Sequence, residues 1–503
     1  MSEHMHWSEW LAGRVIEEKN EPYVISGGMT TSGPAHLGTL CEFLFPSVIR
    51  DAIEKRGKKC SFYFAADILD AFDGVPVEME KHTEFLKPHL GKPLCDVPDP
   101  TGKSRSFGDY YLDEARELME KFGVKPVVVR INEYYNEGKF DEYARFFLKN
   151  ENETRMVIEQ TSGKEEKKDW SPIMPICECG KIATTRVISH DGENYEYICD
   201  KDVKYTKGCG HRGKNKISDH RYKIVWRLHW PVWKQIFGTS IEGAGIDHHT
   251  KGGSEDTCEV ITLKLMKKDY HIHYRYGFIL FQGKKYSKSK GIGMGVREIV
   301  TLLPAEIIKY MLVRPDLEEN IDINPTSENL LRTIEDFEGA SKLEQGKLDE
   351  MGRPERKRAI AFAISTNKMR WKSFLDLLLY YQIYQNWEEV GKKLNDNEGA
   401  FYLKPFIEEW IARDFIPEDY RFKYQAGKVP ISENVKKYMV GISGGDALSI
   451  HNSVFEFAKA NSIEPKQMFA ELYQAVIGKP KGPRMGKLIE ALGVERLKRD
   501  LGL

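Results

Sequence analysis

Two short segments, far apart in the chain, carry residue types suited to binding a nucleotide. The first, residues 32–39, follows an apolar run at 23–25 and contains glycines, a proline and a histidine. This order predicts a strand, a tight turn and the start of a helix, where backbone N–H groups can bind phosphate. His36 can donate to phosphate oxygens, and Gly38 lets a nucleotide come close to the backbone. The segment therefore predicts a polyphosphate site.

The second segment, residues 285–291, has the sequence Lys-Tyr-Ser-Lys-Ser-Lys-Gly. Lys285 and Lys288 can neutralise the charge that develops on a leaving pyrophosphate, and Ser287 and Ser289 can donate hydrogen bonds to it. Alone, either segment is equally compatible with a capped helix or a solvated basic loop. Together they favour the activation of a carboxylate by ATP, which needs positioning and preorganised positive charge.

The first segment belongs to a predicted unit of strand, helix and strand. We expect a strand at 23–26, a helix at 34–56 that Pro46 kinks, and a second strand at 60–65. A further strand is expected at 127–131. A strand, a crossover helix and a parallel strand open a doubly wound sheet, so the predicted fold class is α/β.

In this order, the two segments resemble the HIGH and KMSKS signatures of class I aminoacyl-tRNA synthetases. More narrowly, further stretches resemble the class I lysyl-tRNA synthetases found mainly in archaea and some bacteria. These stretches are residues 28–34, Asp67 with Asp70, residues 226–231, 245–248, 252–254 and 274–280, and Gly478 with residues 482–486. The resemblance spans essentially the whole chain. The chain departs from the family at Thr39, where Asn is usual, at Tyr286, where Met is usual, and at residues 101–104.

The resemblance implies a Rossmann-like catalytic domain of the HIGH type and roles for particular residues. The implied catalytic residues are His36, Gly38, Thr39, Lys285, Ser287 and Lys288. The implied nucleotide-binding residues are His36, Gly38, Asp247, Lys285 and Lys288. The implied amino-acid-binding residues are Gly28, Thr30, Asp67, Trp226, His248, Tyr274 and Tyr276.

A lysine ligand presents an apolar four-carbon stem and two ammonium groups. Trp226, Tyr274 and Tyr276 can form the walls around the stem, with cation–π attraction to an ammonium group. Asp67 or Asp70 can accept an ammonium group after the second strand, at the carboxyl edge where such sheets bind ligands. Plain core packing is the alternative role for the tryptophan.

Four of the eight cysteines, Cys177, Cys179, Cys199 and Cys209, lie close together in the sequence. Four thiolates can close a tetrahedral site around Zn²⁺ with no open position, which is typical of structural zinc. His211 could replace one sulfur, and reduced cysteines without a metal are the alternative. We expect the cluster to hold an insertion, residues 164–219, that approaches the acceptor end of tRNA.

Length and composition indicate a globular protein of two to four domains. The chain has 503 residues, a net charge of −1, 41% hydrophobic residues and 30% charged residues. It contains no run of eighteen apolar residues and no signal-peptide pattern, so we expect a cytoplasmic protein without a membrane segment. The expected domains are two halves of the catalytic domain at 1–163 and 220–324, the insertion at 164–219, and an all-α domain at 325–503.

Local positive charge could support binding of RNA by the C-terminal region. Residues 351–372 contain seven Lys or Arg and one acid, and residues 477–503 contain seven and three. Trp371 and Phe374 could stack on unpaired bases. A solvated helix face explains such counts equally well. The resemblance implies that this domain reads the anticodon.

The resemblance therefore implies a lysine–tRNA ligase that uses ATP and Mg²⁺, has structural Zn²⁺, and acts on L-lysine and tRNA(Lys). We favour a monomer. One alternative is a class I synthetase for another amino acid. The residues of the amino-acid pocket decide which amino acid is used. Two others are a small-molecule adenylyltransferase, which seldom needs a long helical region, and a tRNA-binding paralogue that has lost catalysis.

Overall fold

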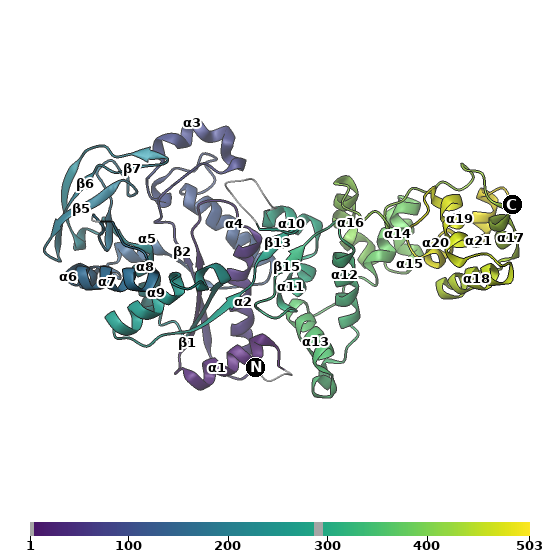
Figure 1. Ribbon diagram of the computed structural model, residues 1–503, viewed down its shortest axis with the longest axis horizontal. Helices are drawn as coiled ribbons and strands as arrows, with labels where there is room; N and C mark the ends of the chain where they lie inside the picture. The colour runs from purple at the N-terminus through teal and green to yellow at the C-terminus, as the bar shows by residue number, and fades with distance from the viewer. Residues whose placement is uncertain (1–4, 168, 286–294) are drawn as a thin grey trace. The chain divides into compact units, whose positions relative to one another are not determined.

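The computed structural model describes residues 5–167, 169–285 and 295–503 (Figure 1). Contacts between residues divide the chain into two compact units. The first, which we call the sheet unit, comprises Met1–Ile299, Lys309–Asp322 and Met351–Ile364. The second, the helical unit, comprises Val300–Ile308, Ile323–Glu350 and Ser365–Leu503.

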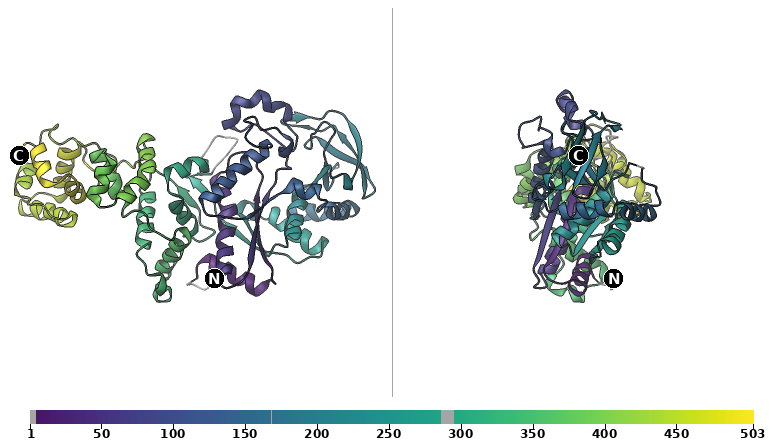
Figure 2. Two further views of the ribbon diagram at one scale, coloured as in Figure 1. Left: turned by 180° about the vertical axis from the view of Figure 1, so that it is seen from behind. Right: turned by 90° about the vertical axis from the view of Figure 1, so that its left-hand side faces the viewer.

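A five-stranded parallel sheet forms the centre of the sheet unit (Figure 2). Its strand order is β12-β11-β1-β2-β3. Its strands are β1 (Tyr23–Met29), β2 (Cys60–Ala66), β3 (Val127–Arg130), β11 (Ile241–Gly245) and β12 (Ile272–Tyr276). The expected parallel sheet is thus confirmed. The strand order runs outward from β1 in both directions, so the switch point of the topology lies between β1 and β11.

Helices cover both faces of this sheet. A Cβ added to Gly27 of β1 would lie 2.5 Å from the backbone oxygen of Glu42 in α2 (Leu37–Glu54). The neighbouring Ser26 instead bonds to Glu242 of β11, which accepts from Trp230 of α8 (Trp226–Phe237). Successive residues of a strand point to opposite faces, so α2 and α8 lie on opposite sides of the sheet.

The helix predicted at 34–56 is shorter at its start. Residues 34–36 are extended, and His36 is the N-cap of α2, with φ of −105° and ψ of 172°. Pro46 lies inside α2, buried against the sheet. The extended segment leaves His36 free of helical geometry and lets its backbone bridge to Gly295. The bridge between His36 and Gly295 lies at the site described below.

The cysteine-bearing insertion enters and leaves the sheet unit through paired strands. Strands β4 (Ile173–Pro175) and β10 (Tyr222–Ile224) are antiparallel neighbours. Between them, β5 (Thr185–His190), β6 (Asn194–Cys199) and β9 (Arg212–Lys216) form an antiparallel sheet in the order β5-β6-β9. A short hairpin joins β7 (Asp202–Val203) and β8 (Thr206–Lys207). Figure 1 shows β5 and β6 beside α6 (Asp141–Lys149) and α7 (Glu151–Ser162).

Further elements complete the first two thirds of the chain. The helices are α1 (Trp7–Glu18), α3 (Thr83–Leu86), α4 (Phe107–Lys121), α5 (Ile131–Asn136), α9 (Ser254–Val260), α10 (Val296–Leu302), α11 (Ala305–Val313) and α13 (Arg353–Ser365). The strands are β13 (Ile279–Phe281), β14 (Lys284–Lys285) and β15 (Ile321–Ile323).

The helical unit is built from α-helices, as the sequence predicts for the C-terminal region. They are α12 (Glu328–Ala340), α14 (Phe374–Tyr384), α15 (Trp387–Leu394), α16 (Asn397–Ala412), α17 (Glu433–Gly441), α18 (Ala447–Ala460), α19 (Pro465–Ile477), α20 (Met485–Leu492) and α21 (Val494–Asp500). Met439, Val454, Leu472 and Leu488 are fully buried in its C-terminal core. Among the helices of the described residues, none combines the length and apolarity needed to cross a membrane.

Candidate functional site

A cavity of about 510 Å³ opens at the carboxyl ends of β1, β11 and β12. It lies at the switch point of the strand order, where open α/β sheets bind their ligands. The residues that line it are Gly28, Met29, Thr30, Ser32, Gly33, Pro34, His36, Gly38, Thr39, Glu42, Gly245, Asp247, His248, Tyr276, Gly277, Phe278, Ile279 and Lys285.

The start of α2 forms one side of the cavity. The hydroxyl of Thr39 accepts a hydrogen bond from the backbone N–H of His36 at 3.2 Å and so caps the helix. The imidazole of His36 lies over Gly38, where a Cβ would be 2.9 Å from the ring carbon Cε1. Burial, helped by the charge of Lys285, lowers the pKa of His36 to about 4. The ring is therefore neutral at pH 7, and it has one N–H to donate.

Described residues at the start of the second signature and just after it lie close to the first signature. The first residue of the second signature is Lys285, which lines the cavity; its ammonium bonds to the carboxylate of Asp247 and lies 4.4 Å from the ring centre of Phe278. After the second signature, Gly295 bridges to His36, and Val296 donates its N–H to Ala35 at 3.0 Å. The predicted residues Ser287 and Lys288 lie in 286–294, outside the described residues. The structure thus brings the flanks of the two signatures together.

The residues predicted to bind the amino acid divide into two groups. Gly28, Thr30, His248 and Tyr276 line the cavity. Tyr274 lies two residues before Tyr276 on the same face of β12, so its ring is buried further from the edge of the sheet, packed over Gly243.

Trp226 does not line the cavity either. Its ring stacks on Trp230, with the ring centres 5.5 Å apart, and Trp230 in turn lies 5.5 Å from the ring of His248. Trp226 is thus connected to His248 through the ring of Trp230, and it is itself exposed. The two tryptophan rings stack because the spacing of four residues places both on one face of α8.

Asp67 has a partner that the sequence did not reveal. Its buried carboxylate accepts a hydrogen bond from the ammonium of Lys223 at 2.7 Å, and Asp70 binds the same ammonium. Asp70 also accepts from the hydroxyl of Thr30 at 2.9 Å. Burial alone would lower the pKa of Lys223, but the two carboxylates outweigh it and raise the pKa above its ordinary value. The expected acceptor of a ligand ammonium is thus already paired with an ammonium of the chain.

Glu42 is a cavity residue that the sequence reasoning missed. Its carboxylate accepts a hydrogen bond from the hydroxyl of Tyr276. Burial raises the pKa of Glu42 to about 8. The available signal was an acid among apolar residues 40–45, four residues after Gly38 and thus on the same helix face.

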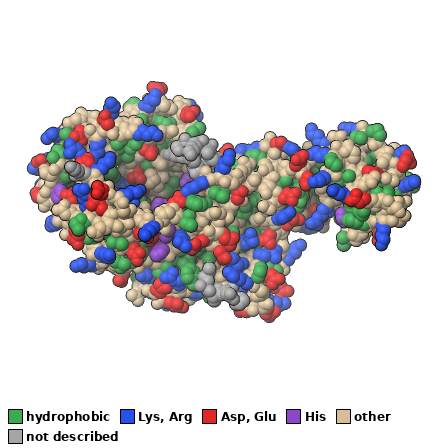
Figure 3. All heavy atoms as spheres, in the orientation of Figure 1, with side chains coloured by type: hydrophobic (Ala, Val, Ile, Leu, Met, Phe, Trp, Pro, Cys, Tyr) green, Lys and Arg blue, Asp and Glu red, His purple; other side chains and the backbone are tan. Residues whose placement is uncertain are grey.

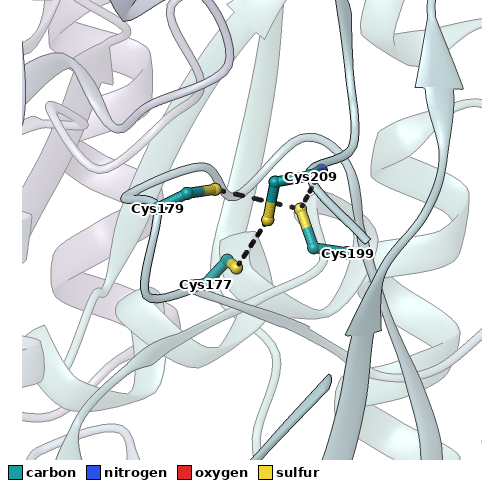
Figure 4. Close-up of side chains that lie close together, drawn as sticks. All are labelled: Cys177, Cys179, Cys199 and Cys209. Atoms are coloured by element: carbon teal, nitrogen blue, oxygen red, sulfur yellow. Dashed lines mark hydrogen bonds between the residues drawn. The ribbon is translucent and has the colours of Figure 1, made fainter. Parts of the chain in front are cut away.

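The four clustered cysteines come together (Figure 4). Their sulfurs all lie within 4.8 Å of one another, with 3.7 Å between Cys177 and Cys209 and 4.0 Å between Cys179 and Cys199. Sulfurs bound to one zinc ion at about 2.3 Å lie about 3.8 Å apart, so the set fits a tetrahedral site. The cluster consists of the four sulfurs and does not include His211.

The helical unit corrects one expectation. Trp371 and Phe374 are buried, so they offer no surface for stacking bases. The Trp371 indole and the Phe374 backbone N–H both donate to the buried carboxylate of Glu338, each at 2.7 Å. The face of this unit seen in Figure 3 carries both Lys or Arg and Asp or Glu side chains. Within the unit, Lys368 pairs with Glu398 at 2.9 Å.

Comparison with known proteins identifies the family. The family model described as tRNA synthetases class I (K) matches residues 5–367. A lysine–tRNA ligase from Archaeoglobus fulgidus is 30% identical over 98% of this chain and 98% of its own length. One from Thermoplasma volcanium is 28% identical over 99% of each chain. A solved glutamate tRNA ligase from Elizabethkingia meningosepticum covers 96% of this chain at 13% identity, with a TM-score of 0.39 that is too low to carry an argument. From its sequence matches, the chain belongs to the class I tRNA synthetases of the lysine type.

Proposed function

We propose that this chain activates L-lysine with ATP to lysyl-adenylate and transfers the lysyl group to the 3′-terminal adenosine of tRNA(Lys). Family membership makes it an ATP-dependent aminoacyl-tRNA synthetase. The observation that carries the reaction is that His36 and Lys285 line one cavity beyond the sheet, with Gly295 bridged to His36. Because His36 and Lys285 face a single space, ATP and the amino acid can meet there.

The proposed chemistry relies on orientation and charge. His36 donates to phosphate oxygens, Gly38 admits the nucleotide, and Thr39 holds the helix start in place. Lys285, with Lys288 and Ser287, stabilises the leaving pyrophosphate. Asp247 holds Lys285 before ATP arrives and contacts the ribose afterwards. Mg²⁺ enters with ATP and neutralises phosphate charge.

The amino-acid pocket is proposed to use Gly28, Thr30, His248 and Tyr276 directly. The other three predicted residues would support it from behind. Asp67 holds Lys223 and, through it, Asp70 and Thr30. Trp226 supports His248 through the ring of Trp230, and Tyr274 packs beneath Tyr276.

We also propose that Cys177, Cys179, Cys199 and Cys209 hold a structural Zn²⁺ that orders the insertion at 164–219, which approaches the acceptor end of tRNA. Metal analysis of the purified protein should find about one zinc ion per chain. Cys199→Ser should remove it, while Cys60→Ser, at a half-buried cysteine outside the cluster, should not. Protein prepared with zinc but free of metal would contradict the proposal.

For the other parts of the chain, the proposal follows the sequence. Residues 1–163 and 220–324 form the two halves of the catalytic domain, and 325–503 bind the anticodon. The enzyme is a cytoplasmic monomer. Because a helical unit that reads the anticodon must bind tRNA(Lys) itself, exchange of an anticodon base should weaken binding to the full chain.

The decisive experiment is ATP–pyrophosphate exchange with lysine, with and without tRNA(Lys), and with glutamate, arginine and cysteine as controls. Exchange with lysine alone supports the proposal, and exchange only with tRNA means that RNA completes the site. Folded, zinc-loaded protein without lysine-dependent exchange would overturn it. Activity with a control would identify a synthetase for another amino acid, and tRNA binding without exchange would identify a silent paralogue.

A further inference from the structure

We propose that Glu42 receives the ε-ammonium of lysine and so determines the specificity of the pocket, with Tyr276 holding its carboxylate in place. This inference rests on the proposed function, because it names the residue that recognises the side chain of the substrate. It starts from the placement of one carboxylate and one hydroxyl in the cavity.

Two of the described residues that line the cavity are carboxylates, and they differ in their partners. Asp247 is about half exposed and is paired with Lys285. Glu42 is bonded to a neutral hydroxyl, and within the described part of the chain no Lys, Arg or His forms an ion pair with it. Glu42 is half-buried at the cavity wall, and without a cation beside it this partial burial disfavours the charged form of its carboxylate. An ammonium group entering the cavity would supply that cation.

The position of Glu42 along α2 favours the ε-ammonium over the α-ammonium. The carboxylate of lysine that reacts must lie beside the phosphates, near His36. Glu42 comes six residues later, about 9 Å along the helix axis, and its side chain tilts back toward the helix start. The four-carbon stem of lysine can span the gap that is left. The α-ammonium lies too close to the reacting carboxylate to do so.

Neighbouring groups set the charge of Glu42. Burial raises its pKa to about 8, the hydrogen bond from Tyr276 lowers it, the charge of Glu242 on β11 raises it, and Lys234 on α8 lowers it. The other charged or titratable residues lining the cavity are His36, His248, Lys285 and Asp247. Below about pH 8, lysine must therefore displace a proton from Glu42, so lysine affinity should increase as the pH rises to that value.

Calorimetric titration of the full-length protein with lysine and with norleucine, which lacks the ε-ammonium, tests the proposal. Glu42→Gln keeps the size of the side chain and can still accept from Tyr276. We expect about 100-fold weaker lysine binding, because a charged partner is lost, and a change of less than about three-fold for norleucine. In the wild type, lysine binding at pH 7 should release a proton, and the variant should release none.

Glu338→Gln, at a buried glutamate of the helical unit, is the matched control and should leave both affinities unchanged. If Glu42→Gln weakens lysine and norleucine equally, or weakens neither, Glu42 does not bind the ε-ammonium. If the glutamine variant fails to fold, Glu42→Asp and Tyr276→Phe replace it, and each should weaken lysine selectively by about 10-fold. Wild-type protein that binds no lysine would instead contradict the proposed function.

Discussion

Two carboxylates near the same edge of the sheet, the buried Asp67 and the half-buried Glu42, differ in what neutralises them. Asp67, just after β2, is paired with the ammonium of Lys223, which the chain itself supplies from β10. Among the described residues, Glu42 of α2 accepts from the hydroxyl of Tyr276 and forms no ion pair. Asp67 has a counter-ion from the chain, shared with Asp70, although its second oxygen is buried without a hydrogen-bond partner, and Glu42 is proposed to gain its cation from the ligand. The contrast teaches that an acid indicates a place for a ligand cation when it lines a cavity and the chain supplies no cation beside it.

The largest effect on stability should come from removing the Lys223 ammonium that pairs with Asp67. Lys223→Met leaves Asp67 buried without a counter-ion, so we expect a loss of about 3–5 kcal/mol in the free energy of unfolding. Urea denaturation at pH 7 measures it. Adding Asp67→Asn to Lys223→Met should restore part of the loss. A loss below about 1 kcal/mol would show that Asp67 and Asp70, like Glu42, need no cation from the chain.

The raised pKa of Glu42 should make the stability of the protein depend on pH. The folded-state pKa of Glu42 is raised from 4.5 to about 8, so the folded protein binds more protons than the unfolded chain between these values. Stability therefore falls as the pH rises through this window, by an amount on the order of 2–4 kcal/mol. Glu42→Gln should remove that decline, measured by urea denaturation at pH 5 and pH 8 without lysine. Parallel pH profiles for both proteins would refute the raised pKa.

Glu338 in the helical unit sharpens the comparison, because two N–H donors satisfy it without any cation. Burial raises the pKa of Glu338 to about 7, while the bonds from Phe374 and Trp371 lower it. The amide oxygen of Glu338→Gln can accept the same bonds, so the free energy of unfolding at pH 7 should change by only about 1 kcal/mol. Glu338→Ala should cost more, since it orphans both donors. If Glu338→Gln and Glu338→Ala cost the same, the hydrogen bonds from Trp371 and Phe374 contribute nothing to the free energy of unfolding.

The smallest effect is expected at the exposed pair of the cavity. Lys285 and Asp247 are each about half exposed, so solvent screens their attraction. Asp247→Asn should change the free energy of unfolding by less than about 1 kcal/mol, and added salt should diminish the difference. Thermal melts at low and high salt provide the measurement. A loss that does not change with salt would mean that this pair is shielded from solvent, as the pair of Lys223 and Asp67 is.

Much of the sheet could be predicted from local patterns. The strand expected at 23–26 is the start of β1, and the strands expected at 60–65 and 127–131 correspond to β2 and β3. Short apolar runs bounded by turn residues carry that signal within a few positions. The position of the cavity followed from the same pattern, because parallel strands place their carboxyl ends at one edge. The roles assigned to the residues that line it stay predictions.

The pairing of distant charges could not be predicted in this way. Lys223 is far from Asp67 in the sequence, and nothing in the local pattern connects them. The role of Glu42 could not be predicted for a different reason. A single acid in an apolar helix does not show which residues its side chain faces. Trp371 was misjudged because a basic, aromatic composition does not distinguish a buried side chain from an exposed one.

The pairing of β4 with β10 has a consequence for how this protein could be rebuilt. Because the chain leaves and re-enters the sheet unit on adjacent strands, the two ends of the insertion already sit side by side. A shorter segment could therefore be joined at that junction without displacing either strand. It would have to replace the packing of Tyr195 and Tyr197, which share one hydrophobic core with Val24 and Ala65 of the parallel sheet.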